Sequence, residues 1–268
     1  MIGHTRSIVI TGSTRGIGFN LAGAFLERGC EVTISGHTQA TVDEALVALG
    51  AKYSDERIFG IICDVTNYQQ VQSLWEASKN HFGRIDIWIN NAGTASPRMN
   101  FWDLPPDKYD EVVRSNVIGT MYGIKVALSG MLAQGYGALY NMEGFGARGR
   151  GMQGMTLYGS TKASVHFINK SLAQEVAGTP VITGAIAPGM VITDLITRQY
   201  VGREAELEKA KPILNIIAER PETVAPVLAD KILHNQKNGI TITFASPARI
   251  MLKFFSASFK KRDLFSAQ

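Results

Sequence analysis

Short runs of apolar and β-branched residues alternate along this chain with longer segments of helical periodicity, and this alternation constrains the fold most strongly. Two of the longer segments, 17–28 and 68–82, repeat apolar residues at the spacing of one helix face. The short runs are Ser7 to Thr11, Glu31 to Ser35, Ile58 to Cys63, Ile85 to Asn90, Ala138 to Met142, Val181 to Ala187 and Gly239 to Phe244. Strands that alternate with helices build parallel βαβ units, so we predict a parallel α/β sheet covered by helices on both faces.

The handedness of βαβ crossovers makes a single doubly wound sheet the simplest arrangement of these elements. We therefore predict a Rossmann-type fold of about seven strands, in the order 3-2-1-4-5-6-7. The predicted domain covers residues 1–245 and contains a lid insertion at about 196–218, where the charged helical piece Arg203 to Lys211 interrupts the alternation.

Residues 246–268 are predicted to form an amphipathic, basic C-terminal tail, in which aromatic and basic side chains are interleaved. Such a tail could lie on a membrane surface as an amphipathic helix. It could also pack on a neighbouring subunit, pack on its own chain or be disordered. The sequence leaves these alternatives open.

Composition restricts the classes of function. A formal net charge of +4 over 268 residues is too small to indicate nucleic-acid binding, but it suits an anionic ligand such as a dinucleotide. The two cysteines indicate a reduced, cytoplasmic protein, with peripheral membrane contact left open through the tail. No leader peptide or membrane-spanning run is expected. The five histidines lack metal-ligand spacing, so no metal site is predicted.

A glycine-rich turn follows the first predicted strand. Glycines there let the backbone approach a pyrophosphate, to which the next helix offers its free N–H groups. An ordinary strand-to-helix turn is the alternative. The candidate cofactor-binding residues of this turn are Gly12, Ser13, Thr14, Arg15, Gly16, Ile17 and Gly18.

The end of the second predicted strand favours NADP(H) over NAD(H). An NAD site usually places a carboxylate there for the ribose 2′-hydroxyl, but the segment 34–38 has none. The guanidinium of Arg15 could bind a 2′-phosphate instead. His37 is a second candidate, and either side chain could equally be a solvated surface group.

Tyr158 and Lys162 lie four residues apart on a predicted helix and so share one face. An ammonium beside a phenol is expected to lower the pKa of the phenol toward the range useful for acid–base catalysis. Asn116 lies on an otherwise apolar stripe that includes Val112, Val113 and Thr120. A buried amide needs partners, so Asn116 either makes a structural hydrogen bond or holds a water in a proton relay to Lys162.

Six motifs follow one another along the chain: the glycine turn Thr11 to Gly18, Asp64-Val65, Asn90 to Gly93, Asn116, Tyr158 with Lys162, and Pro188-Gly189 with Thr193. Together they resemble the short-chain dehydrogenase/reductase family over the range Ser7 to Thr193. The resemblance implies that Tyr158 is the proton donor, that Lys162 binds the ribose and modulates the pKa of Tyr158, and that Asn116 holds the relay water. It also implies a homodimer or homotetramer formed through the helices that carry Asn116 and Tyr158. Further cofactor contacts implied by it are Asp64, Val65, Asn91, Ala92, Gly93, Pro188, Gly189, Val191 and Thr193.

One departure from the family pattern is the absence of its catalytic serine after the fifth strand, where this chain has Glu143, Gly144 and Phe145. This strand end and the segments 187–195 and 215–225 are similar to chlorophyll b reductases and their bacterial relatives. The sequence thus favours an NADPH-dependent reductase of an apolar, bulky formyl substrate. The alternatives are a 3-oxoacyl or steroid reductase and a non-catalytic NADP(H)-binding regulatory protein.

Overall fold

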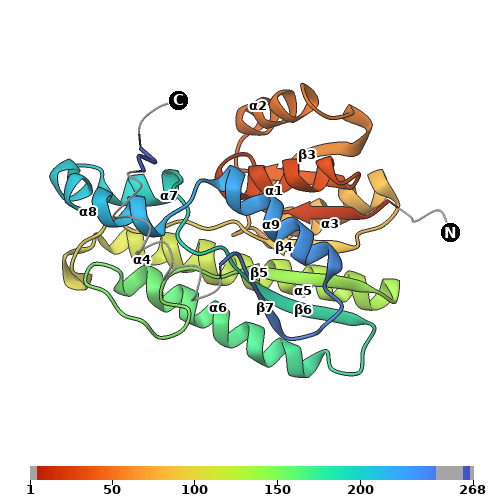
Figure 1. The fold of residues 1–268 in the computed structure, drawn as a ribbon. Helices are drawn as coiled ribbons and strands as arrows, with labels where there is room; N and C mark the ends of the chain where they lie inside the picture. The colour runs from red at the N-terminus through yellow and green to blue at the C-terminus, as the bar shows by residue number, and fades with distance from the viewer. Residues whose placement is uncertain (1–4, 246–261, 266–268) are drawn as a thin grey trace.

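The computed structural model describes residues 5–245 and 262–265, and these contain one parallel sheet in the order β3-β2-β1-β4-β5-β6-β7 (Figure 1). The fold class and the strand order predicted from the sequence are confirmed. The observed strand bounds differ from the predicted ones by no more than two residues at either end. The strands are β1 (Ser7–Ile10), β2 (Glu31–Gly36), β3 (Ile58–Ile62), β4 (Ile87–Asn90), β5 (Gly137–Met142), β6 (Val181–Ala187) and β7 (Ile240–Thr243).

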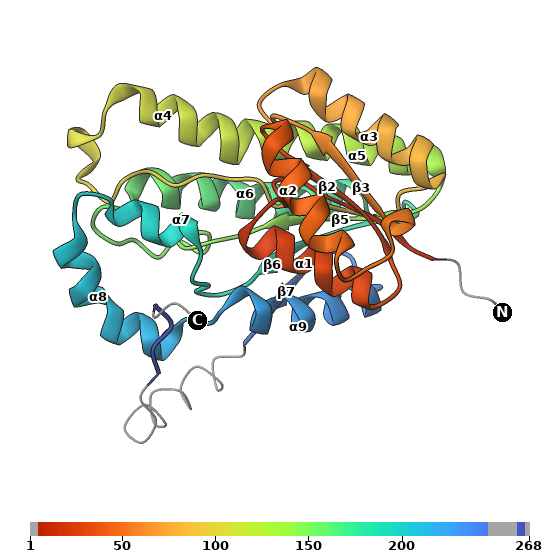
Figure 2. The ribbon, with the colours of Figure 1, turned by 90° about the horizontal axis from the view of Figure 1, so that it is seen from above.

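Helices cover both faces of the sheet (Figure 2). On one face Phe25 of α1 and Leu228 of α9 belong to one buried apolar cluster, and on the other Leu74 of α3 and Ala127 of α5 belong to a second. The helices flanking the sheet are α1 (Gly16–Glu27), α2 (Gln39–Gly50), α3 (Tyr68–Phe82), α4 (Pro106–Val113), α5 (Gly119–Gln134), α6 (Thr156–Glu175) and α9 (Pro221–His234). Short 3-10 helices are η1 (Asp55–Arg57), η2 (Phe101–Asp103) and η4 (Arg198–Tyr200), and a π-helical turn, η3 (Arg114–Ile118), joins α4 to α5.

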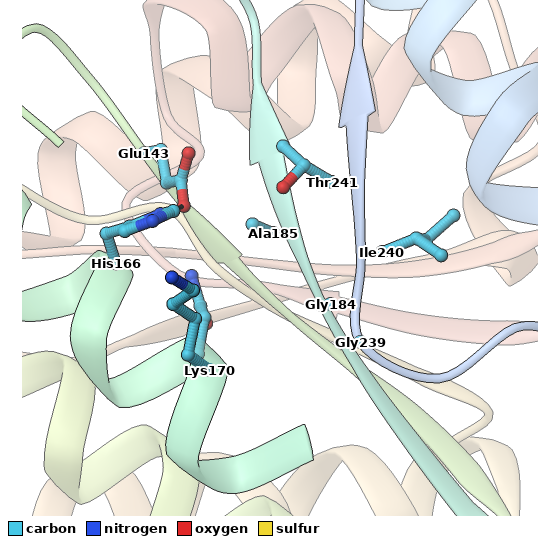
Figure 3. A pocket seen from close by; sticks show the side chains of 9 residues that line it. Glu143, His166, Lys170, Gly184, Ala185, Gly239, Ile240 and Thr241 are labelled. Carbon is cyan, nitrogen blue, oxygen red and sulfur yellow. Dashed lines mark hydrogen bonds and ion pairs between the residues drawn. The ribbon is translucent and has the colours of Figure 1, made fainter. Parts of the chain in front are cut away.

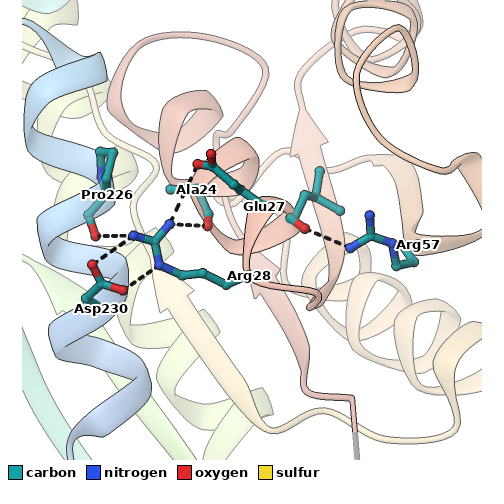
Figure 4. Close-up of polar contacts among 7 residues, drawn as sticks. Ala24, Glu27, Arg28, Arg57, Pro226 and Asp230 are labelled. Carbon is teal, nitrogen blue, oxygen red and sulfur yellow. Dashed lines mark hydrogen bonds and ion pairs between the residues drawn. The ribbon is translucent and has the colours of Figure 1, made fainter.

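The C-terminal end of α1 is fastened to α9 by Arg28 (Figure 4). Its guanidinium donates from Nε to Oδ1 of Asp230 at 2.6 Å and from Nη2 to Oδ2 at 2.8 Å. It also donates to the carbonyls of Ala24 and Pro226, at 2.7 and 3.1 Å. A fork of this kind is well defined in geometry. It fixes the helix whose other end carries the glycine turn.

The segment between β6 and α9 holds α7 (Asp194–Thr197), η4 and α8 (Glu204–Ile217). In both overall views α8 lies at the left end of the molecule, with α7 beside it (Figures 1 and 2). This segment begins at the carboxyl end of β6, and all strands run parallel. The helices α7 and α8 therefore lie beyond the carboxyl ends of the strands. Open α/β sheets bind their ligands at that edge.

The tail was predicted over 246–268, and most of it lies outside the described residues. The described part, 262–265, packs on its own chain: the amide of Leu264 donates to Asn215 Oδ1 at 2.9 Å, and Arg262 pairs with Glu219. Lys211 lies over the ring of Phe265 at 5.4 Å. No helix within residues 5–245 and 262–265 is long and apolar enough to cross a membrane.

Candidate active site

The glycine turn between β1 and α1 has the tight geometry that its sequence requires. Gly12 and Gly16 have φ angles of 60° and 59°, which side-chain-bearing residues rarely adopt. A Cβ atom on Gly12 would lie 2.8 Å from the Cα atom of Ala92, and one on Gly18 would lie 2.5 Å from Nδ2 of Asn91. The turn therefore lies directly against the residues that follow β4, with no room for side chains between them.

Hydrogen bonds hold these two segments together. The hydroxyl oxygen of Thr11 accepts from the amides of Asn91 and Ala92 at 3.0 and 3.1 Å. The side-chain amide of Asn91 donates to the carbonyls of Thr11 and Gly12 at 2.9 and 2.8 Å. The family resemblance implied Asn91 and Ala92 as cofactor contacts, and the structure brings both to the glycine turn.

The side chain of Ser13 faces the interior. Its hydroxyl donates to the carbonyl of Ile10 at 2.6 Å and accepts from the amide of Ser35 at 3.0 Å. Its backbone amide also donates to the carbonyl of Ser35 at 2.8 Å. Ser13 therefore links the turn to the end of β2 and is fully buried.

The N-terminus of α1 fits a pyrophosphate. Arg15 occupies the N-cap position and makes no side-chain cap, so the first amides of the helix are not satisfied by that side chain. Gly16 and Gly18 keep this end free of side-chain bulk. A cradle of glycines at an uncapped helix N-terminus is suited to a dinucleotide phosphate.

The end of β2 carries Ser35 and Gly36 and no carboxylate. A Cβ atom on Gly36 would lie 2.5 Å from Cγ2 of Thr14, so this position does not accept a side chain without rearrangement. The guanidinium of Arg15 is exposed and lies 3.8 Å from the carboxylate of Asp194. His37 is exposed just after β2.

The remaining predicted cofactor residues lie along the same edge of the sheet. Cγ2 of Thr193 is 3.5 Å from the position of a Cβ atom on Gly16, so the segment after β6 borders the glycine turn. Asp64 uses Oδ1 to accept two bonds from Thr66, each of 2.9 Å, and Val65 is buried against α5. Pro188, Gly189 and Val191 follow β6, and Val191 bridges to Glu219.

Tyr158 and Lys162 are both buried on one face of α6. Nζ of Lys162 lies 5.8 Å from the centre of the Tyr158 ring and donates to the carbonyl of Met142 at 3.1 Å. Burial lowers the pKa of Lys162 to about 8, an effect that the carboxyl group of Glu143 opposes. Burial raises the pKa of Tyr158 to about 12. The expected lowering of the phenol pKa is thus not seen in this structure, because desolvation of the phenolate is the dominant effect.

Asn116 lies in the π-helical turn η3, where the amide of Gly119 donates to the carbonyl of Arg114, five residues back. Its Oδ1 accepts from the amide of Thr94 at 2.8 Å. Its Nδ2 donates to the carbonyl of Thr94 at 2.9 Å and to Oγ1 of Thr161 at 3.0 Å. The side chain therefore makes structural hydrogen bonds that join the end of β4 to α6. The water-holding role stays a prediction.

Gly93 joins this group from the end of β4. A Cβ atom on it would lie 2.9 Å from Oδ1 of Asn116 and 3.7 Å from Nζ of Lys162. The three residues predicted to be catalytic are thus gathered around one strand end, beside the glycine turn.

The position at which the family pattern has a serine lies against the candidate catalytic residues Tyr158 and Lys162. A Cβ atom on Gly144 would lie 2.4 Å from the hydroxyl oxygen of Tyr158 and 3.3 Å from Cγ of Lys162. Glu143, directly before it, is 3% exposed and pairs through Oε1 with Nδ1 of His166 at 2.7 Å. His166 was not among the candidate residues named from the sequence. Its spacing of four residues from Lys162 was the signal for a shared face.

A model of the short chain dehydrogenase family matches residues 6–203. A probable chlorophyll(ide) b reductase of Arabidopsis thaliana, chloroplastic, is 31% identical over 98% of this chain and 55% of its own length. A second chlorophyll(ide) b reductase of that plant is 36% identical over 84% of this chain and 65% of its own length. This chain thus spans between half and two thirds of the length of these curated relatives.

A bacterial protein and two solved structures are also similar to this chain. A 3alpha-hydroxysteroid dehydrogenase of Mediterraneibacter gnavus is 33% identical over 70% of this chain and 74% of its own. The solved structure of ElxO with NADP bound is 25% identical, covers 90% of this chain and 97% of its own, and superposes with a TM-score of 0.78. Levodione reductase, at 23% identity and a TM-score of 0.81 with 90% and 96% coverage, shares the fold.

Proposed function

Since this chain belongs to the short-chain dehydrogenase/reductase family, and is thus an NAD(P)-dependent oxidoreductase of carbonyl and alcohol groups, we propose that it is an NADPH-dependent reductase of a bulky aldehyde. The observation that carries the proposal is the contact of Gly144 with the Tyr158 hydroxyl. The hydroxyl occupies the space that a side chain at position 144 would need, so this position supplies no second hydrogen-bond donor to a substrate carbonyl.

In this proposal the glycine turn and the N-terminus of α1 hold the dinucleotide phosphates, and Asn91, Gly93 and Thr193 border its sugar and nicotinamide. When bound, the nicotinamide dinucleotide supplies the hydride. Tyr158 donates its hydroxyl proton to the carbonyl oxygen of the substrate. The ammonium of Lys162, held at 3.1 Å from the Met142 carbonyl, stabilises the phenolate that remains.

The absence of the family's serine bears on the substrate. A hydrogen-bond donor lost from a site built around it typically costs about 2.7–4 kcal/mol in the transition state. An aldehyde is more electrophilic than a ketone and tolerates this loss better. Similarity to chlorophyll(ide) b reductases at 31% and 36% identity supports a formyl-bearing macrocycle as the substrate class.

A second candidate is the reduction of steroid or 3-oxoacyl ketones, which the 33% identity to a 3alpha-hydroxysteroid dehydrogenase favours. A third is a non-catalytic NADP(H)-binding protein. The retention of Tyr158 and Lys162 as a buried pair argues against the third, because a binding protein needs no proton donor.

We further propose self-association through α5 and α6. Both helices carry large apolar side chains in solvent: Met121 and Leu132 on α5 are 42% and 45% exposed, and Phe167 on α6 is 70% exposed. Burying such side chains between copies is favourable. The test is the mass in solution of a Phe167→Glu variant. A mass smaller than that of the parent would support this arrangement, and an unchanged mass would contradict it.

The test of the proposed function is NADPH oxidation with a panel of carbonyl compounds that includes bulky aromatic and macrocyclic aldehydes, small ketones and 3-oxoacyl thioesters. We expect bulky aldehydes to be reduced fastest. Tyr158→Phe, which removes the transferable proton and keeps the ring, should abolish turnover while NADPH still binds by fluorescence. Faster reduction of small 3-oxoacyl compounds would replace this proposal with the second candidate, and NADPH binding without turnover of any carbonyl would favour the third.

A further inference from the structure

A stripe of polar residues continues along α6 beyond the pair already described, and the inference drawn from it rests on the proposed function. Tyr158, Lys162 and His166 follow one another at intervals of four residues, so they lie on one helix face. Asn169 continues this stripe and is 7% exposed. The stripe faces the end of β5, because the side chain of Asn141 on β5 donates a hydrogen bond to Asn169 on α6.

Glu143 is paired with this stripe while almost completely buried. Its Oε1 lies 2.7 Å from Nδ1 of His166, and the side chains of Glu143 and His166 are 2% and 25% exposed. The amide of Glu143 donates to the carbonyl of Ile186 at 2.8 Å, so β6 fixes the backbone that carries this carboxyl group. A buried carboxyl group needs such partners, because its transfer from water is costly.

A series of side-chain hydrogen bonds also leads to Asn169 on α6, starting from β4 and passing through β5. The indole of Trp88 donates to Oδ1 of Asn90 at 2.7 Å, and Nδ2 of Asn90 donates to Oδ1 of Asn141 at 2.7 Å. Nδ2 of Asn141 donates to Oδ1 of Asn169 at 2.6 Å. The last donor of this series is Nδ2 of Asn169, a buried atom for which the described residues provide no acceptor.

A small cavity lies beside Glu143 and His166, and Asn169 also lines it (Figure 3). It has about 30 Å³ of space for the centres of water molecules, enough for one or two waters. Oε2 of Glu143 is a buried acceptor for which the described residues provide no donor. The cavity is lined by Glu143, His166, Asn169, Lys170, Gly184, Ala185, Gly239, Ile240 and Thr241.

The two unsatisfied atoms complement each other, because one is a donor and the other an acceptor. A water that accepts from Nδ2 of Asn169 and donates to Oε2 of Glu143 would satisfy both. Buried polar groups without a protein partner are generally satisfied by such ordered water. Lys170 is exposed at the rim of the cavity, so solvent can reach this site along α6.

The site touches the catalytic residues through Lys162. The carbonyl that accepts from Nζ of Lys162 belongs to Met142, the residue directly before Glu143. On its own helix Lys162 has Tyr158 and His166 four residues away on either side. Gly93 lies close to both Lys162 and the side chain of Asn116, and the carboxyl group of Glu143 acts on Lys162 electrostatically. Among these, Glu143 is the carboxyl group. It also opposes the loss of charge that burial imposes on Lys162.

We propose that Glu143, held by His166 and by a water bound between Glu143 and Asn169, is a positioning residue that keeps Lys162 charged beside Tyr158. The end of β5 thus differs from the family pattern in two ways: it lacks the serine, and it has the buried carboxyl group of Glu143. The water site is predicted independently of any reaction.

The experiment that tests this is an NMR titration of Lys162 in the full chain, with lysine labelled at its ε carbon and the Lys162 signal assigned by its absence in Lys162→Met. We expect the parent signal to titrate near pH 8. Glu143→Gln keeps the shape and removes the charge, and it should lower the titration midpoint by about one pH unit. The matched control is Glu175→Gln, which removes an exposed carboxylate from the end of the same helix and should leave the midpoint unchanged.

An unchanged midpoint in Glu143→Gln would overturn the proposal, and this readout needs neither substrate nor turnover. The proposed function therefore fails or stands separately, through the carbonyl panel. If Glu143→Gln does not fold, Glu143→Asp decides: a carboxylate withdrawn by one methylene should lower the midpoint by less than the full shift, and no shift would overturn the proposal. A crystal structure of the parent should show a water bonded to Oε2 of Glu143 and Nδ2 of Asn169, and an empty cavity would contradict the water bridge.

Discussion

Gly144 lies against the hydroxyl of Tyr158, so closely that a single added carbon atom at position 144 would come within 2.4 Å of the phenolic oxygen. Such a separation is too short for a carbon–oxygen contact, and the ring of Tyr158 is fixed by its burial in α6. The position at which the general family pattern has a serine is therefore adapted to glycine in this chain.

Gly144→Ser should not restore a faster enzyme, and both Gly144→Ser and Gly144→Ala should reduce turnover. Either side chain displaces the Tyr158 hydroxyl, and a misplacement of about 1 Å can cost on the order of 100-fold in rate. The measurement is kcat/KM for NADPH-dependent aldehyde reduction, with NADPH binding measured beside it. Gly151→Ala is the matched control, since a Cβ atom there meets nothing within 4 Å. Faster turnover in Gly144→Ser would show that the site has room for the serine.

Arg15→Ala should erode a preference for NADPH over NADH. One charge-assisted contact to the 2′-phosphate is worth about 1.5–3 kcal/mol, which is roughly ten- to a hundredfold in kcat/KM. The carboxylate of Asp194 lies 3.8 Å from Arg15 and partly offsets its charge. Asp194→Asn should therefore change the preference in the opposite direction. Equal kcat/KM for the two cofactors in the parent would contradict the interpretation of the β2 end.

Reductase activity should decline as the pH rises through about 8, because burial lowers the pKa of Lys162 to that value. The sign is set by the role of the lysine: its charged form stabilises the phenolate of Tyr158, and this form is lost above the pKa. The measurement is the pH profile of kcat/KM for the parent with NADPH and its best aldehyde. A profile that stays flat well above that pH would remove the charge of Lys162 from the mechanism.

Asp230→Asn should destabilise the fold by loosening α9 from α1. The Arg28 guanidinium holds the pKa of the Asp230 carboxyl below its usual value. The pair therefore stabilises the fold above the unfolded-state pKa of about 3.9, and this contribution is lost as the pH falls through the folded-state pKa. Because Asp230 is 55% exposed, solvent screening limits the effect to about 1 kcal/mol, or roughly 2–4 °C in Tm.

Thermal unfolding at neutral and at acidic pH measures this contribution. The difference in Tm between the parent and Asp230→Asn should shrink in acid. Glu44→Gln, which removes an exposed carboxylate from α2, is the control for net charge and should leave the Tm unchanged at both pH values. A difference that persists in acid would assign the effect to packing of the side chain.

The fold could be predicted from the sequence because each strand and helix of this architecture carries its own local pattern. The segment 68–82 was predicted to the residue as a helix, and Asn67 caps its start while Gly83 ends it with a φ of 78°. The glycine turn was predictable for the same reason, since Gly12 and Gly16 are needed for backbone conformations that few other residues adopt.

The sequence could not show how helix faces meet strand ends. The pairing of Glu143 with His166 joins residues 23 positions apart, and it depends on the packing of α6 on β5. The same holds for Tyr158: its neighbour Lys162 suggested a lowered pKa, whereas burial, which no local pattern reports, raises it to about 12. Val113 was placed on the buried stripe of Asn116, but it is 39% exposed.

The π-helical turn η3, which carries Asn116, bears on how this chain tolerates changes in length. A regular α-helix turns by about 100° per residue, and the one extra residue of a π turn shifts the register of α5 relative to α4. Deleting a neighbour of Asn116 within Arg114–Ile118 should restore a regular helix and turn the side chain of Asn116 away from Thr94 and Thr161. Surface loops generally accept insertions and deletions, whereas we expect that the number of residues between Pro106 and Gln134 cannot change without moving Asn116.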